Sequence, residues 1–384
     1  MAAEDGRIPF NRAALTGAEL ELIAQALASG QISGDGPFSK RCQRLLGEIL
    51  DAPGRVLLTP SGTQALEMAA LLIGVGEGDE VIGPSFTFPS TLGAFALRGA
   101  TPRFADIRPD TLNVDPREIE RLIGPRTRAI VVTHYAGIAC EMDAIMELSR
   151  AHELPVVEDA AHGLFGSHGD RALGTIGRCG ILSFHETKNL TSGGEGGALI
   201  LRDEEDLRRA EVIREKGTDR AAFFRGEVDA YAWTDFGSNY LLSEPQAAYL
   251  LAQLEARERI QGARELAWTA YAEGLAGWAD EQGVMLPEVS PGGSRQPWHL
   301  FWMLMPDPGA RDALLAHLGE RRVHAVFHYT PLHSSPMGRR LAPETGRLPV
   351  TEDVAGRLLR LPLHYGLSDT ERRAVIEAVL EFQP

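Results

Sequence analysis

Short, continuously apolar segments alternate with amphipathic segments through the first half of the chain. Continuous apolar runs favour strands buried on both faces of a sheet, and the amphipathic segments between them have the spacing of helices. The alternation therefore predicts an α/β fold, with βαβ units around a mostly parallel sheet. The strand-like runs are RVLLT, DEVIGP, RAIVVTHY, LPVVEDA and GILSF, and the helical ones include QALEMAALLIG and AIMELSRAH.

The pattern changes near residue 250. From Ser243 a long amphipathic segment, PQAAYLLAQLEARERIQGARELAWTAYAEGL, predicts a connecting helix that leads into a smaller α+β unit. We expect a large domain over residues 1–250 and a small C-terminal domain over residues 251–384. Internal repeats and low-complexity tracts are absent from the sequence, which argues against a solenoid.

Composition and charge narrow the classes of function. A formal net charge of −15 disfavours a nucleic-acid surface, so an anionic ligand would need a local basic site. The longest apolar run, near Met68 to Val75, is too short to span a membrane, and the N-terminus lacks the layout of a signal peptide. We expect a cytoplasmic protein, in which Cys42, Cys140 and Cys179 are reduced thiols without a role.

Several common catalytic signatures are missing. The sequence has no G-x-x-x-x-G-K-[ST], no H-E-x-x-H and no G-x-S-x-G motif. His324 and His328 stand four residues apart, but no glutamate lies between them and no third ligand is evident, so we expect no metal site.

Three features that remain fit one chemistry. A buried strand ends on Asp159, at the edge of an open α/β sheet where ligands bind. Lys188 follows in a loop beside a glycine-rich turn, and Ser61, Gly62 and Thr63 begin a helix whose free N–H groups favour a phosphate. These are the three groups that pyridoxal 5′-phosphate (PLP) requires. A carboxylate keeps its pyridine nitrogen protonated, a lysine forms the Schiff base with it, and a helix N-terminus holds its phosphate.

Each of these features also has a plainer interpretation. Asp159 and Lys188 could form a structural ion pair, and Ser61 could simply cap a helix. Their joint occurrence, in this order along a βαβ pattern, favours the cofactor site.

The motifs PSGTQALEMAAL, PSFTFPST, VVEDAAHG, SFHETKN, GGEGGAL and GSNYLLSEPQAAY occur in the order typical of one family. Over nearly its whole length the chain resembles the DegT/DnrJ/EryC1/StrS nucleotide-sugar aminotransferases. Stretches such as FHETKN, IREKGT and AVFHYTPLH look most like the TDP-4-oxo-6-deoxy-D-glucose transaminases, which make TDP-4-amino-4,6-dideoxy-D-galactose. The resemblance implies the aspartate aminotransferase-like fold of PLP-dependent transferases (fold type I) and a homodimer with shared active sites.

The resemblance also implies roles for individual residues. Lys188 would carry PLP and move a proton, and Asp159 would pair with the pyridine nitrogen. His162 stands where such enzymes often have a glutamine beside the ring hydroxyl, which leaves its contact open. The other implied cofactor contacts are Phe88 on the ring face, and Gly62, Thr63, Ser183 and the partner subunit's Asn239 at the phosphate.

The implied reaction has two halves. L-Glutamate would convert PLP to pyridoxamine 5′-phosphate, which would then aminate the C4 ketone of a TDP-4-oxo-6-deoxyhexose. For the substrate we expect contacts with Arg225, which follows two phenylalanines in a basic segment, and with His185, His328 and Tyr329.

Other functions stay open at this stage. A TDP-4-oxopentose or a 3-oxo sugar could be the acceptor, since the sequence does not define the pocket around C5. The 3-dehydratase branch of the family replaces the lysine with histidine, so Lys188 argues against it. A non-catalytic PLP-binding regulatory protein is a remote alternative, with no evident reason to keep acid, amine and cup together.

Overall fold

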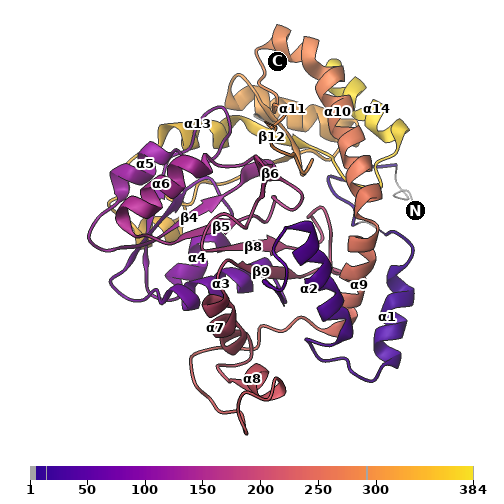
Figure 1. The fold of residues 1–384 in the computed structure, drawn as a ribbon. Coiled ribbons are helices and arrows are strands. Elements are labelled where there is room, and N and C mark those ends of the chain that lie inside the picture. The colour runs from indigo at the N-terminus through magenta and orange to yellow at the C-terminus, as the bar shows by residue number, and fades with distance from the viewer. Residues whose placement is uncertain (1–5, 14, 291–292, 384) are drawn as a thin grey trace.

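A seven-stranded sheet forms the centre of the protein (Figure 1). The structure is a computed structural model that describes residues 6–13, 15–290 and 293–383. From β8 to β3 the neighbouring strands are parallel, whereas β9 runs antiparallel to both β8 and β1. In sheet order the strands are β1 (Val56–Thr59), β9 (Gly197–Leu201), β8 (Cys179–Ser183), β5 (Val156–Asp159), β4 (Thr127–Thr133), β2 (Glu80–Pro84) and β3 (Thr101–Ala105).

Both faces of this sheet are buried, which explains the continuous apolar runs in the sequence. Successive residues of β4 alternate between two hydrophobic clusters: Ile130 and Val132 pack in one, and Ala129 and Val131 in the other. The first cluster includes helices α2 (Pro37–Ile49), α5 (Pro116–Leu122), α6 (Met142–His152) and α9 (Glu244–Glu255), and the second α3 (Gly62–Ile73), α4 (Ser90–Ala96) and α7 (Glu204–Arg214). The expected α/β class with a mostly parallel sheet is confirmed.

The C-terminal third packs around a second, antiparallel sheet. Its strands are β10 (Phe301–Leu304), β12 (Leu358–Leu361) and β11 (Val326–Phe327), with β12 in the middle. The helices α10 (Arg257–Gln282), α11 (Pro308–Glu320) and α14 (Asp369–Leu380) share a hydrophobic cluster with this sheet. The segment expected to be one connecting helix is two, α9 and α10, because the backbone at Ala256 leaves the helical conformation.

The hydrophobic clusters change partway along α10. Ile260 belongs to the cluster of the large sheet, whereas Ala267 belongs to that of the small sheet. A domain boundary at residue 250 stays a prediction.

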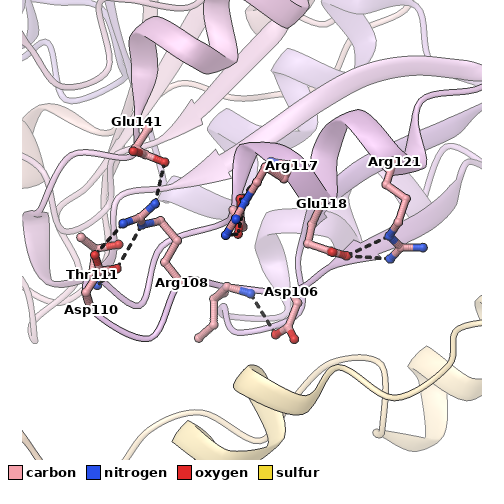
Figure 2. A network of polar contacts seen from close by, with 10 residues as sticks. Asp106, Arg108, Asp110, Thr111, Arg117, Glu118, Arg121 and Glu141 are labelled. Atoms are coloured by element: carbon pink, nitrogen blue, oxygen red, sulfur yellow. Dashed lines mark hydrogen bonds and ion pairs between the residues drawn. The ribbon is translucent and has the colours of Figure 1, made fainter.

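A buried carboxylate joins the two sheets. Asp106, just after β3, accepts hydrogen bonds from the backbone N–H groups of Val350 and Thr351 (3.0 and 2.8 Å) at the start of α13 (Pro349–Arg357). Charged pairs surround the loop that follows Asp106, among them Arg108 with Asp110 at 2.6 Å and with Glu141 at 3.1 Å (Figure 2). These pairs lie at the surface, where each contributes little to stability.

The remaining elements are short or peripheral. The helix α8 (Arg220–Phe224) lies on an excursion that extends away from the body beyond α7 (Figure 1). The others are α1 (Glu19–Ala28), β6 (Ser167–His168), β7 (Arg171–Ala172), the 3₁₀ turn Tyr135–Gly137 and α12 (Pro336–Leu341). Across the described residues, none of the helices combines the length and the apolar character that a bilayer crossing requires.

A buried carboxylate at the start of α9 caps the N-terminus of α2. The Glu244 side chain is fully buried and accepts hydrogen bonds from the backbone N–H groups of Gly36, Phe38 and Ser39, at 2.7 to 3.1 Å, and from the Ser39 hydroxyl at 2.5 Å. It therefore occupies the N-terminus of α2, where the helix dipole favours negative charge.

We predict that Glu244→Gln lowers the free energy of unfolding by about 3 kcal/mol, because the amide brings one acceptor oxygen where two are used. Urea unfolding followed by circular dichroism measures this. On the same helix Glu255 forms an exposed pair with Arg41 at 3.1 Å, so Glu255→Gln is the matched control and should change stability by less than about 1 kcal/mol. Equal effects of the two substitutions would contradict the capping role.

Candidate active site

A cavity of about 550 Å³ opens where the parallel strands end. β5, β8 and the N-terminus of α3 contribute residues from the large sheet, and β12 contributes residues from the small one. Of the twelve residues predicted from the sequence, ten line it: Gly62, Thr63, Phe88, Asp159, His162, Ser183, His185, Lys188, His328 and Tyr329.

Asp159 is the acid at the centre of this cavity. It is the last residue of β5 and only 5% exposed. The Thr91 hydroxyl donates to its Oδ2 at 2.6 Å, and the N–H of Ala161 donates to its Oδ1 at 3.1 Å. Both bonds fix the direction of the carboxylate. The Thr91 hydroxyl also lies 2.8 Å from the hydroxyl of Thr87, which continues the chain of hydroxyls toward β4.

Lys188 lies in the loop between β8 and β9. Its backbone N–H donates to the His185 carbonyl at 2.9 Å, which forms a tight turn. Removal from water lowers the pKa of the Lys188 ammonium to about 8, against the opposing attraction of Asp159. Lys188 and Asp159 form no ion pair within 4.0 Å, and the Asp159 carboxylate is hydrogen-bonded to Thr91 and Ala161.

The N-terminus of α3 faces the same cavity. The Ser61 hydroxyl caps the helix by accepting from the N–H of Gln64 at 3.1 Å, as the plainer interpretation expected. The N–H groups of Gly62 and Thr63 occupy the first helical turn, where a helix supplies no acceptor. A Cβ on Gly62 would come within 3.1 Å of the Ser183 Cβ, so glycine allows this close approach. These groups together can hold an anion.

Three histidines form one wall of the cavity. The His162 ring stacks on His299 with centroids 4.2 Å apart, and His328 lies 6.1 Å from His162. Burial lowers the pKa of all three well below its usual value, so they are neutral at pH 7. The Nδ1 of His299 lies 2.7 Å from the Asn189 side-chain oxygen, which makes Nδ1 the protonated nitrogen of that ring. The Nδ1 of His162 is buried and lacks a hydrogen-bond partner among the described residues.

The outer rim of the cavity is more exposed. Phe88 is 58% exposed although it lines the cavity. The His185 Nδ1 lies 2.9 Å from the Thr187 hydroxyl, and its Nε2 lies 3.7 Å from Glu195. The rim therefore offers a flat aromatic face and polar groups to a ligand that enters from solvent.

Two predicted residues lie outside this cavity. Arg225 is on the excursion that contains α8, and its guanidinium pairs with Glu211 at 2.8 Å and Glu227 at 2.9 Å. Asn239, further along the same excursion, is exposed. Within one chain neither residue reaches the site, and their roles stay predictions.

The structure adds residues that sequence reasoning missed. Thr91, which holds Asp159, lay within the quoted motif PSFTFPST but received no role. Asn189 likewise lay within the quoted motif SFHETKN without a role, whereas His299 and Arg360 gave no comparable signal, because they lie in the C-terminal third of the chain. Over the residues that the structure describes, no group of three histidine, cysteine or acidic side chains is arranged to hold a metal ion.

Comparison with known proteins places this site in a family. A model of the DegT/DnrJ/EryC1/StrS aminotransferase family matches residues 14–380. Among curated proteins, the spore coat polysaccharide biosynthesis protein SpsC of Bacillus subtilis is 32% identical over 380 residues, which is 97% of this chain and 96% of SpsC.

Solved structures agree over the whole length. The aminotransferase TlmJ from Streptoalloteichus hindustanus is 33% identical and superposes with a TM-score of 0.89 over 98% of both chains. DesV of S. venezuelae, solved with a ketimine intermediate, is 32% identical with a TM-score of 0.88 over 98% of this chain and 100% of DesV. This protein belongs to the DegT/DnrJ/EryC1/StrS aminotransferase family and is an aminotransferase.

Proposed function

We propose that this aminotransferase uses PLP to move an amino group from L-glutamate to the C4 ketone of a TDP-4-oxo-6-deoxyhexose. The observation that carries the cofactor assignment is the meeting of Asp159, Lys188 and the N-terminus of α3 in one cavity. The sugar class is supported by the family and by SpsC, which is named for polysaccharide biosynthesis.

The free polar groups of the cavity fit the cofactor. The backbone N–H groups of Gly62 and Thr63 can receive its phosphate, and the Asp159 carboxylate can pair with its pyridine nitrogen. The unpartnered Nδ1 of His162 suits the ring hydroxyl. When bound, PLP supplies a protonated ring that withdraws electrons from the substrate carbon next to nitrogen.

The chain's own groups then position the substrate and move a proton. With a pKa of about 8, the Lys188 amine is partly neutral at pH 7, so its Nζ can accept a proton and return it. The hydrogen bond from Thr91 fixes the direction of the Asp159 carboxylate. His162, His299 and His328 add no positive charge, because burial keeps them neutral.

Lys188 is one of only three lysines in the sequence, and the proposed function depends on it. Wild-type protein loaded with PLP should lose its long-wavelength absorbance band with L-glutamate and regain it with TDP-4-oxo-6-deoxy-D-glucose. Lys188→Ala should do neither at a measurable rate, since among the described residues no other amine lines the cavity. Lys40→Ala and Lys216→Ala, at exposed positions, are matched controls that should behave as wild type.

The outcomes separate the parts of the proposal. Bleaching by glutamate without recovery on this sugar would mean a different acceptor, with a TDP-4-oxopentose and a 3-oxo sugar the next to test. A band that does not respond to glutamate would contradict glutamate as the donor.

A second prediction follows from the pKa of Lys188. The neutral amine is the nucleophile that captures PLP, so the capture rate of cofactor-free protein should rise with pH and level off above about pH 8. Between pH 6 and pH 8 the neutral fraction rises roughly 50-fold for a pKa of about 8. Stopped-flow absorbance measures this rate. A rate that keeps rising tenfold per pH unit up to pH 10 would indicate an unshifted lysine.

The proposal also includes a homodimer in which the partner subunit's Asn239 completes the phosphate site. Asn239 is exposed on an excursion that also exposes Trp233 and Phe236, at 78% and 69%. Clustered exposed aromatic residues are typical of an interface. We predict that sedimentation equilibrium gives twice the 41.7 kDa chain mass and that Trp233→Ser with Phe236→Ser shifts the protein toward monomer. A monomeric wild-type protein would contradict the shared site.

The proposal also places the protein in the cytoplasm. Fractionation of the source cell would test this location.

A further inference from the structure

Asn189, the residue after Lys188, has a buried side chain whose nitrogen and oxygen are both hydrogen-bonded to the C-terminal part of the chain. Its Nδ2 donates to the Pro297 carbonyl at 2.5 Å and to the Gln261 Oε1 at 3.0 Å, and its Oδ1 lies 2.7 Å from the Nδ1 of His299. Pro297 and His299 precede β10, and Gln261 lies on α10. The amide therefore joins the lysine loop to residues 72 to 110 positions further along the chain.

The directions of these hydrogen bonds follow from the carbonyl. The Pro297 oxygen can only accept, so the Asn189 atom beside it is the amide nitrogen, and the atom beside His299 is the amide oxygen. That oxygen needs a donor, which places the proton of the His299 ring on Nδ1. The buried Arg264 guanidinium donates to the His299 carbonyl and, at 3.0 Å, to the Trp298 carbonyl. His299 is thus held by its side chain and by its backbone.

We infer that Asn189, held by His299, is a positioning residue that directs the Lys188 amine into the cavity. This inference rests on the proposed function, in which that amine captures the cofactor and moves a proton. Consecutive Cα atoms are about 3.8 Å apart, so fixing Asn189 leaves the Lys188 backbone little freedom. On its other side, the Lys188 N–H donates to the His185 carbonyl at 2.9 Å. The backbone that carries the lysine side chain is therefore fixed in both directions.

The contact crosses the junction between the two hydrophobic clusters. Lys188 comes from the loop after β8 and His299 from the segment before β10, and both line the cavity. Gln261 lies on the part of α10 where the packing changes, between Ile260 in the cluster of the large sheet and Ala267 in that of the small sheet. The position of the Lys188 amine therefore depends on how the C-terminal third packs against the large sheet.

The pKa of Lys188 reports the position of its amine. Burial lowers this pKa to about 8, while the charge of Asp159 raises it and that of Arg360 lowers it. Asn189 is uncharged, and His299 is neutral because burial holds its pKa well below its usual value. Replacing either residue with an uncharged one removes no charge near the amine. A rise in the pKa of Lys188 in such a variant would mean that the amine has moved into water.

Competitive labelling with acetic anhydride tests the inference on cofactor-free protein. Peptide mass spectrometry gives the acetylation of each lysine against pH, so the midpoint for Lys188 is read without turnover. We expect a wild-type midpoint near pH 8, and we expect Asn189→Ala to raise it by about one unit or more. At pH 7 a rise of one unit lowers the neutral fraction about ninefold, and the rate of PLP capture should fall with it.

Asn113→Ala is the matched control. Asn113 is also buried, donates through Nδ2 to the Ile138 carbonyl at 2.9 Å and accepts at Oδ1 from the N–H of Tyr135 at 2.8 Å, but it does not line the cavity. We expect it to lower stability to urea, as Asn189→Ala does, and to leave the Lys188 midpoint unchanged. A midpoint that rises equally in both variants would mean a general loosening of the fold and would overturn the inference.

Two substitutions at His299 keep the test possible if Asn189→Ala does not fold. In His299→Asn the side-chain N–H can replace Nδ1 as the donor to Asn189, whereas His299→Leu leaves no donor. We expect the Lys188 midpoint to rise in His299→Leu and to stay close to that of wild type in His299→Asn. Equal midpoints in the two variants would rule out this hydrogen bond as the positioning contact.

The labelling also separates this inference from the proposed function. A midpoint in folded Asn189→Ala equal to that of wild type would overturn the inference even if the enzyme transaminates. A raised midpoint in a protein that does not take up PLP would leave Asn189 as the residue that positions the Lys188 amine and would remove the cofactor assignment.

Discussion

The hydrogen bond between Thr91 and Asp159 is the interaction around which the rest of the site is arranged. A buried polar group needs hydrogen-bond partners in place of water, and the Asp159 carboxylate, which is 5% exposed, has them in the Thr91 hydroxyl and the N–H of Ala161. These donors come from the start of α4 and the end of β5, so the sheet and its covering helix must both be in place. The fold therefore holds a carboxylate where the ring nitrogen of the proposed cofactor could pair with it.

The neighbouring residue shows how one strand serves both stability and chemistry. Glu158 points to the opposite face of β5, where its carboxylate accepts from the N–H groups of Gly174, Ile176 and Gly177 at 2.6 to 2.9 Å. His134 lies 2.9 Å from the same carboxylate and follows the last residue of β4. Glu158 thus fixes the ends of two parallel strands and the loop before β8. Because Asp159 is the next residue of β5, this buried network also fixes its position.

The sequence predicted those parts of the site that local patterns encode. Asp159 ends an apolar run, Lys188 lies beside a glycine-rich turn, and Gly62 and Thr63 follow a helix cap, so each is visible within a few residues. His299 and Arg360 were missed because they lie more than 100 residues after Lys188 in the sequence, and only the folding of the C-terminal third brings them to the cavity. The antiparallel direction of β9 and the break at Ala256 also escaped prediction, because tertiary packing rather than apolar pattern decides them.

The central claim is that Lys188 holds the cofactor, and the most direct test is chemical. Borohydride reduction of the PLP-loaded protein would fix the cofactor on its lysine, and peptide mapping by mass spectrometry would locate it. The account predicts modification of Lys188 alone, with the exposed Lys40 and Lys216 unmodified at one equivalent of PLP. Modification of either of those lysines in place of Lys188, or none at all, would contradict it.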